Sequence, residues 1–163
     1  MKTNTMRTVL AIGMAVTIVS GTSFAAARNA GQPIVGAWRT VVTIVNCESG
    51  QPVGAPPIIG MSTFNLGGTM SEWGLGPGSS PAQRSPSHGV WQRDSGPRDY
   101  WFTFTHYRYD ASGALIGSQK VAADAVLARN GDSYDSIAEV EIRDVNNGVI
   151  ATACATSVGT RIE

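Results

Sequence analysis

Two stretches near the ends of the chain, each carrying one of its only two cysteines, constrain the fold most. Residues 34–47 (IVGAWRTVVTIVNC) are rich in β-branched side chains and are long enough to cross a small barrel. Residues 151–162 (ATACATSVGTRI) form the last strand that the sequence predicts. We expect the two strands to pair in antiparallel fashion, which would join the start of the sheet to its end. This pairing predicts an all-β barrel.

The first 27 residues have the layout of a secretory signal peptide. Lys2 and Arg7 precede an apolar run over residues 9–19, small residues follow at 25–27, and cleavage is expected after Ala27. Residues 28–163 would then form the mature chain, a single β-barrel domain by its length. Because the apolar run is shorter than the roughly 20 residues that cross a bilayer, we expect no membrane span and a periplasmic or extracellular location.

The charge balance excludes some classes of partner. Without Lys2 and Arg7, the 12 Lys and Arg residues fall to 10 against 12 Asp and Glu, a net charge of −2 with His neutral. This balance argues against a surface that binds nucleic acids or anionic membranes. We therefore expect no nucleic-acid partner.

The two cysteines, Cys47 and Cys154, predict a disulfide bond. In an exported chain, a single pair of cysteines more often forms a bridge than a metal site or a nucleophile. If Cys47 lies directly opposite Cys154, Val45 faces Thr156, and each further pair of antiparallel partners has position numbers with the same sum. Because side chains alternate along a strand, Trp38 and Arg161 then share the opposite face as close neighbours.

Trp38, in the segment Gly36-Ala37-Trp38, and Arg161 resemble a pair shared by lipocalins, fatty-acid-binding proteins and avidins, which form the calycin superfamily. In that superfamily the Trp closes one end of an antiparallel barrel and the Arg packs across it. The chain is also similar to small uncharacterised bacterial secreted proteins with a lipocalin-like barrel. The resemblance implies that Trp38 and Arg161 plug one end of the barrel; the alternative is that they contact a ligand.

Eight strands joined mainly by short turns are expected. They cover residues 34–47, 58–66, 69–73, 88–93, 99–109, 115–129, 134–143 and 151–162. Gly67-Gly68 and Asn130-Gly131 are strong hairpin signals. The order predicts an eight-stranded antiparallel up-and-down barrel with its first and last strands paired. Residues 74–88 have no period and form the longest predicted loop, either a binding lid or a mobile connection.

The strand over residues 99–109 carries aromatic side chains on both faces. We place its even positions inward, because Tyr100, Phe102 and Phe104 make that face the more apolar. On the outward face, the aromatic residues would form a contact surface for a partner protein or a second copy of the chain. These residues are Trp101, Tyr107 and Tyr109. The alternative is ordinary cross-strand pairing on a solvated sheet.

A barrel of eight strands either packs solid or holds one small ligand. The inward positions of the later strands are small, including Ala123, Ala138 and Ala155, and they leave room unless the aromatic residues opposite fill it. We therefore predict a cavity for a small hydrophobic ligand. The candidate ligand-binding residues are Trp91, Tyr100, Phe102, Phe104, His106 and Arg108. His106 and Arg108 would lie toward one mouth and hold an anionic or hydroxylated end; the alternative places both in solvent.

No catalytic, cofactor or metal site is expected. His88 and His106 are the only histidines, and neither has a neighbour at metal-ligand spacing. The carboxylates are expected mostly in turns and on outer faces. Three functions remain open: a carrier or sensor of a small apolar or aromatic ligand, a protein-binding barrel such as a protease inhibitor, and a barrel isomerase or cyclase. An enzyme is the less favoured class.

Overall fold

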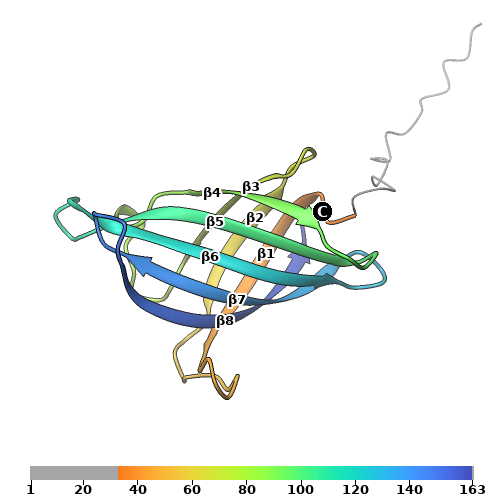
Figure 1. Cartoon of the computed structure of the whole chain (residues 1–163), viewed down its shortest axis with the longest axis horizontal. Helices are drawn as coiled ribbons and strands as arrows, with labels where there is room; N and C mark the ends of the chain where they lie inside the picture. The colour runs from red at the N-terminus through yellow and green to blue at the C-terminus, as the bar shows by residue number, and fades with distance from the viewer. Residues whose placement is uncertain (1–32, 163) are drawn as a thin grey trace, which may run out of the picture.

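The structure, a computed structural model, describes residues 33–162 as one closed antiparallel barrel (Figure 1). The strands follow one another around the barrel in chain order, and the first pairs with the last. The predicted up-and-down barrel is confirmed. The elements are β1 (Gly36–Val45), β2 (Ile58–Phe64), β3 (Thr69–Leu75), the short 3-10 helix η1 (Pro81–Gln83), β4 (Ser87–Arg93), β5 (Asp99–Tyr109), β6 (Leu115–Leu127), β7 (Ser133–Arg143) and β8 (Val149–Arg161). The predicted signal peptide, residues 1–27, lies outside the described residues.

The strand boundaries follow the sequence signals closely. β5 begins and ends at the predicted residues, whereas β6 ends two residues before its predicted end and β8 begins two residues before its predicted start. Gly67 and Gly68 have φ angles of 95° and 90° in the turn between β2 and β3. Only glycine adopts such angles without a steric penalty, so this pair fixes the hairpin where the sequence predicts it.

The connection between β3 and β4 is shorter and more ordered than predicted. β3 continues to Leu75, and β4 already includes Ser87, so residues 76–86 remain. η1 lies within this segment and is held by a capping box. The Ser80 hydroxyl accepts from the Ala82 amide at 3.3 Å, and the Gln83 side chain accepts from the Ser80 amide at 3.1 Å. One capped turn has no hydrophobic period, which explains why the sequence pattern missed it.

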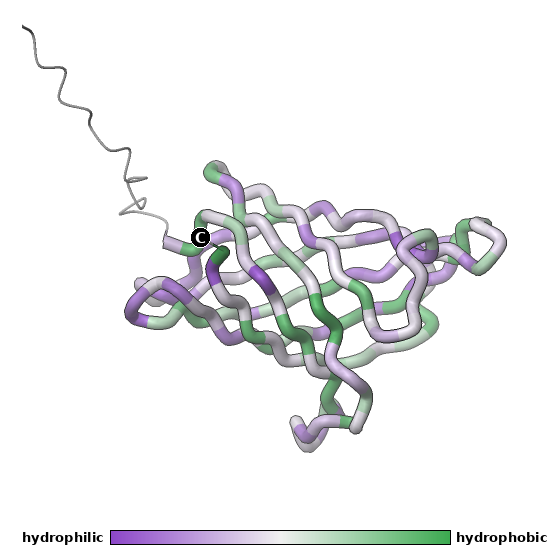
Figure 2. The backbone as a smooth tube through the Cα atoms, turned by 180° about the vertical axis from the view of Figure 1, so that it is seen from behind, coloured by the Kyte–Doolittle hydropathy of each residue, from purple (hydrophilic) through white to green (hydrophobic). Residues whose placement is uncertain are grey.

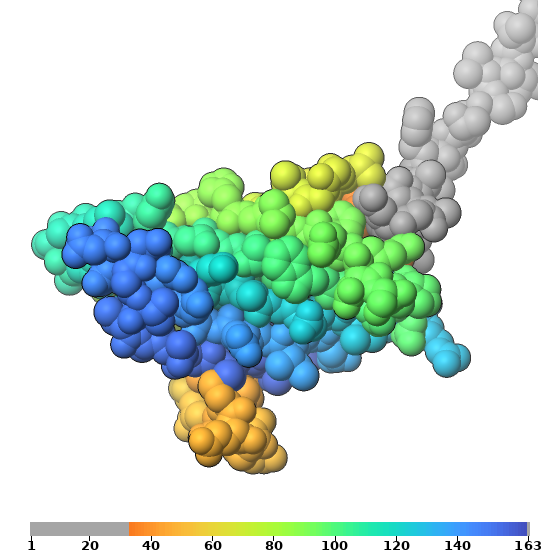
Figure 3. All heavy atoms as spheres, viewed as in Figure 1, coloured from red at the N-terminus to blue at the C-terminus, as the bar shows by residue number. Residues whose placement is uncertain are grey.

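The predicted register between β1 and β8 is wrong by two residues. Val45 lies opposite Cys154, not opposite Thr156. Cys47 lies in the turn after β1 and reaches Cys154 diagonally, with the two Cα atoms 5.2 Å apart in the disulfide bond. A shift of two residues leaves every side chain on its original face, so the inward and outward assignments hold. From this turn, residues 46–57 project away from the barrel wall (Figures 1 and 3).

Side chains alternate between the interior and the surface, as the sequence predicts. Along β7, Tyr134, Ser136, Ala138 and Val140 are buried, while Ile137 between them is 71% exposed. In Figure 2, the colours for hydrophobic and hydrophilic residues therefore change repeatedly along the strands. On β5 the even positions face inward, so Tyr100, Phe102 and His106 are all buried.

Trp38 and Arg161 meet at one end of the barrel. Trp38 is fully buried, and its indole Nε1 donates to the Ile34 carbonyl at 2.9 Å. The Arg161 guanidinium lies 4.1 Å from the centre of the Trp38 ring, a cation–π arrangement. It also donates to the Val35 carbonyl at 3.0 Å and to the Gly131 carbonyl at 2.9 Å. These contacts tie β1, β8 and the turn between β6 and β7 together.

Aromatic rings fill the interior next to Trp38. Phe64 makes edge-on contacts with Trp91, Phe102 and Tyr134, with ring centres 5.4 to 6.1 Å apart. Edge-to-face packing at such distances stabilises aromatic clusters beyond the area that they bury. Trp91 also donates through its indole nitrogen to the Asn65 carbonyl at 3.0 Å. This end of the barrel is packed solid.

Candidate functional site

A cavity of about 380 Å³ occupies the barrel interior beyond the aromatic core. Its space comes from small inward residues on β6, β7 and β8, including Ala123, Ala138 and Ala155. Ser79, Ser80 and other exposed residues form its rim. The interior therefore combines the two alternatives that the sequence left open: one end is packed and the remainder is hollow.

Apolar side chains line the cavity from opposite sides of the barrel. Phe102 and Phe104 of β5 stack with their ring centres 6.3 Å apart and their planes only 10° from parallel. Val42 and Ile44 of β1 and Val121 of β6 contribute aliphatic surface to the lining. The hydrophobic body of a ligand would lose its contact with water between these side chains, which is the main source of binding energy in such sites.

The floor of the cavity carries hydroxyl groups. The Ser62 hydroxyl lies 3.3 Å from the Tyr134 hydroxyl, and the Ser136 and Ser157 hydroxyls lie 2.6 Å apart. Burial raises the pKa of Tyr134 to about 12. The hydrogen bond with Ser62 lowers this pKa, and the Glu72 carboxylate raises it. Tyr134 therefore keeps its proton at neutral pH. These hydroxyls can donate to or accept from a polar atom at the inner end of a ligand.

A buried ionic cluster forms the wall between β3 and β5. Arg84, from the connection between β3 and β4, pairs with the Glu72 carboxylate of β3 and donates to the Gly74 carbonyl. The side chains of Arg84 and Glu72 are only 13% and 12% exposed, respectively. Ser87 donates to Glu72 at 2.7 Å and accepts from Arg84 at 2.9 Å. The Arg84 Nε is buried and has no hydrogen-bond partner among the described residues.

Contacts with β5 hold the segment that carries Arg84. The Ser85 amide donates to the Tyr107 carbonyl at 3.1 Å, and the Tyr107 amide donates to the Ser85 hydroxyl at 2.9 Å. An isolated antiparallel β-bridge also joins the backbones of Arg84 and Arg108. The connection between β3 and β4 is thus pinned beside the mouth of the cavity. Of the two sequence alternatives, a lid or a mobile connection, this geometry favours an ordered cover.

His106 contacts the ionic cluster and lines the cavity. It is 6% exposed, and its Nδ1 lies 3.2 Å from the Arg84 Nη2. Burial lowers the pKa of His106 to about 3, and the positive charges of Arg84 and Arg108 act in the same direction. The imidazole is therefore neutral. Because a guanidinium can only donate, Nδ1 accepts and the proton of His106 is on Nε2.

The candidate ligand-binding residues from the sequence fall into two groups. Phe102, Phe104, His106 and Arg108 line the cavity, in this order from the aromatic core toward the mouth. Trp91 and Tyr100 do not line it, because they are buried in the packed end. The alternative that left His106 in solvent is wrong, since the cover from the β3–β4 connection buries it.

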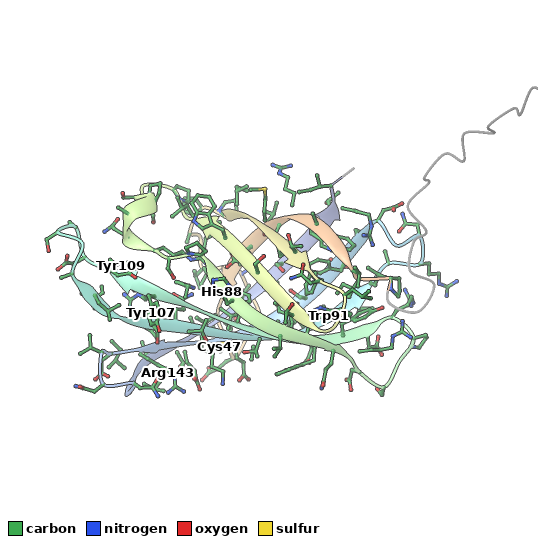
Figure 4. The ribbon with its side chains drawn as sticks, turned by 90° about the horizontal axis from the view of Figure 1, so that it is seen from above. Cys47, His88, Trp91, Tyr107, Tyr109 and Arg143 are labelled. Carbon is green, nitrogen blue, oxygen red and sulfur yellow. A yellow bond between two sulfur atoms is a disulfide. The ribbon has the colours of Figure 1, made fainter. Side chains whose placement is uncertain are left out.

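The outward aromatic residues of β5 do not form the single surface that the sequence suggested. Tyr107 is 56% exposed, and Trp101 is partly exposed on the outer face. The pairing of β5 with β6 shifts between Arg108 and Tyr109, and this irregularity brings Tyr109 to the cavity rim. Tyr107 and Tyr109 lie toward the end of the barrel opposite Trp91 (Figure 4). Binding of a partner there stays a prediction.

Sequence reasoning missed Glu72 and Arg84. Carboxylates are expected mostly in turns and on outer faces, and Glu72 is an exception, because it shares the inward face of β3 with Met70. The alternation of β3 could have identified it, because an inward charge on a strand requires a partner. Nothing in the sequence pointed to Arg84 as that partner, since it lies in a connection without a period.

Comparisons with known proteins leave the function open. No protein-family model matches the chain, and no curated protein matches it significantly. In the described part of the chain, no cluster of three or more His, Cys, Asp or Glu side chains could hold a metal ion. None of the helical segments within residues 33–162 has the length and apolar character needed to cross a membrane.

Proposed function

We propose that this protein is an exported, lipocalin-like barrel that binds a small apolar or aromatic molecule in its interior cavity. The observation that carries the proposal is the cavity of about 380 Å³ beside a packed aromatic core. Its volume is within the range of roughly 300 to 1,000 Å³ that is typical of small-molecule sites. A barrel built only for stability would fill this space, because unfilled apolar volume is destabilising.

The lining supports a ligand with a hydrophobic body. Phe102 and Phe104 provide a flat aromatic surface, and Val42, Ile44 and Val121 add aliphatic surface to the lining. The hydroxyls on the floor and the ionic cluster on one side are few and localised. Small-molecule sites commonly have this composition, in which apolar surface supplies affinity and a few polar groups fix the orientation.

The disulfide bond supports an exported protein. Cys47 and Cys154 are bonded, and such bonds persist in the periplasm and outside the cell but are rare in the cytosol. The signal-peptide pattern ending near Ala27 leads to the same proposal. The calycin resemblance of Trp38 and Arg161 agrees with the barrel architecture and with their contact at one end.

The test is binding of a neutral fluorescent probe, N-phenyl-1-naphthylamine, to the protein and to two variants on the same strand. Ala138→Phe places a ring in the cavity, whereas Ile137→Phe places the same ring on the exposed outer face. We expect saturable binding by the parent protein and by Ile137→Phe, and binding at least about tenfold weaker by Ala138→Phe. Circular dichroism and thermal melting confirm that both variants are folded.

Two results would contradict the proposal. The first is absence of saturable binding by the parent protein across a panel of neutral aromatic and aliphatic probes. The second is equal binding by the two phenylalanine variants, which would place the probe on the surface. Recovery of the bound probe or ligand in unchanged chemical form separates a carrier from the alternative of a barrel isomerase or cyclase.

A further inference from the structure

The outer wall of the barrel has a charged side and an uncharged side. The outward positions of β6 and β7 carry Lys120, Asp124, Asp135, Glu139 and Glu141. Among the outward positions of β1, β2, β3 and β8, by contrast, Arg39 is the only charged residue. Depletion of charge, more than overall hydrophobicity, distinguishes the core of a protein interface from the rest of a protein surface.

Apolar side chains form a continuous patch on the uncharged side. Ile59 of β2 lies directly opposite Val41 of β1, and Val41 lies directly opposite Val158 of β8. In the next row, Met61 of β2 pairs with Trp73 of β3. Ile59, Met61 and Val158 are 44%, 54% and 48% exposed. These five residues are the outer patch, and contiguous exposed apolar residues of this kind mark interaction sites.

A fixed arm projects beside the outer patch. The arm is the connection between β1 and β2, residues 46–57, and each of its residues is exposed (Figures 1 and 3). The bond between Cys47 and Cys154 ties the arm to β8, and the Val53 amide donates to the Ile44 carbonyl at 3.1 Å. A segment that is already held in one conformation loses little conformational entropy when a partner covers it.

The arm and the uncharged side each carry one charge, and the two charges have opposite signs. Glu48 is the only charged residue of the arm, and Arg39 is the only one on the uncharged side. Neither side chain makes an ion pair or a hydrogen bond with another described residue. Within one copy the two are far apart, because the strand from Arg39 to Val45 alone extends about 20 Å.

A second copy of the chain would bring these two charges together. Two copies can pack their uncharged sides against each other with their β1 strands antiparallel, about a two-fold axis near the middle of β1. Glu48 of each copy then lies toward Arg39 of the other. The outer patch, the threonines around it and the arm supply roughly two dozen residues, within the 20 to 30 that a standard interface takes from each partner.

We propose that two copies of this chain associate through the outer patch and the arm, with Glu48 of each copy paired with Arg39 of the other. The apolar patch supplies the affinity, and the two charge pairs fix the relative orientation of the copies. This interface lies outside the cavity and does not depend on a ligand. It also differs from the aromatic surface of β5 that the sequence suggested, because β5 stands half a turn around the barrel from β1.

Sedimentation equilibrium of the parent protein and of two matched valine variants tests the patch. Val158 on β8 and Val126 on β6 are 48% and 49% exposed, and both lie directly opposite Asp135. β6 stands half a turn from β2, so Val126 lies outside the interface. We expect the parent protein and Val126→Lys to dimerise with the same affinity, and Val158→Lys to dimerise at least about tenfold more weakly.

Charge reversal tests whether Arg39 and Glu48 meet between copies. Arg39→Glu and Glu48→Lys each place like charges opposite one another at both contacts of the symmetric dimer, so each should associate at least about tenfold more weakly. An equimolar mixture of the two variants restores opposite charges at both contacts and should form a mixed dimer of near-parental affinity. Mixing cannot restore a pair that forms within one copy.

Several results would overturn the proposal, provided that circular dichroism shows folded variants. One is a parent protein that stays monomeric up to millimolar concentrations; co-sedimentation of that monomer with zwitterionic vesicles would assign the outer patch to a lipid surface instead. Another is equal weakening of the dimer by Val158→Lys and Val126→Lys, which would place the interface elsewhere. Failure of the mixture to recover affinity would refute the pairing of Arg39 with Glu48.

Discussion

The burial of His106 makes the stability of the barrel depend on pH. The pKa of His106 in the folded protein is about 3, against 6.5 for an unperturbed histidine. Between these two values, the unfolded chain binds a proton at this residue and the folded protein does not. Stability is therefore undiminished above about pH 6.5 and decreases as the pH falls through the window toward 3.

The size of the effect follows from the pKa difference. Each pH unit within the window costs about 1.4 kcal/mol, because one more proton is bound by the unfolded chain than by the folded protein. Lowering the pH from 7.5 to 5 crosses about 1.5 units of the window below 6.5. We expect His106 alone to reduce the free energy of unfolding by about 2 kcal/mol over this range. This is a substantial part of the roughly 5 to 15 kcal/mol that stabilises a typical domain.

Urea unfolding followed by tryptophan fluorescence between pH 7.5 and 5 measures this change. The chain offers a matched control, because it has 2 histidines and His88 is exposed on β4. His106→Gln should lose about 2 kcal/mol of the pH dependence, whereas His88→Gln should follow the parent protein. If His106→Gln and the parent protein show the same slope against pH, the assignment of a buried neutral imidazole is refuted.

Two further perturbations test the barrel itself. Reduction of the disulfide bond between Cys47 and Cys154, which are 107 residues apart, should lower the melting temperature by several degrees. The chain-entropy relation limits the lost stability to about 4 to 5 kcal/mol. An unchanged melting temperature in reductant would contradict this prediction. Gly159→Ala should destabilise the barrel by more than about 2 kcal/mol, because the added Cβ would lie 2.1 Å from the Tyr134 ring. Gly76→Ala is the control, because its added Cβ would have its nearest neighbour at 3.6 Å. Urea unfolding should give the parent stability for Gly76→Ala, and an equal stability for Gly159→Ala would contradict the prediction.

The barrel could be predicted because its determinants are local. Alternation along β7 separates Tyr134, Ser136 and Ala138 from outer positions that are polar except for Ile137, and glycines mark the turn between β2 and β3. Both signals act over a few residues, so a single sequence contains them in full. On β5 alternation defines two faces that both carry aromatic residues, and the greater apolar character of the even face predicts that Phe102, Phe104 and His106 lie inward, which the structure confirms.

The register between β1 and β8 could not be obtained in the same way. Alternation fixes which face a residue occupies, but shifting a strand by two residues leaves all faces unchanged. Cys47 and Cys154 would remove this ambiguity only if they were direct cross-strand partners. Cys47 instead lies past the end of β1, where the turning chain brings it diagonally to Cys154. A disulfide constrains distance and not strand pairing.

The ionic cluster was missed for a different reason. Glu72 and Arg84 are 12 residues apart and meet only because the connection between β3 and β4 folds back beside β5. No period or motif encodes that contact. The division of the interior was also beyond the sequence, because whether the aromatic residues fill a barrel depends on how they pack against one another. Here Trp91 and Tyr100 gather at one end and leave the other end hollow.

The position of the ionic cluster connects stability with recognition. Burying an ion pair costs desolvation of both charges, and an apolar pair of similar size is often as stable. The pair of Glu72 and Arg84 therefore adds little to the stability of the barrel that apolar residues could not supply. It does orient Arg84 against Nδ1 of His106, and this contact directs the single proton of His106 to Nε2. Without Arg84 either nitrogen of the neutral imidazole could carry the proton. The cluster thus converts His106 into a fixed donor in the cavity wall, next to Arg108 on the same strand.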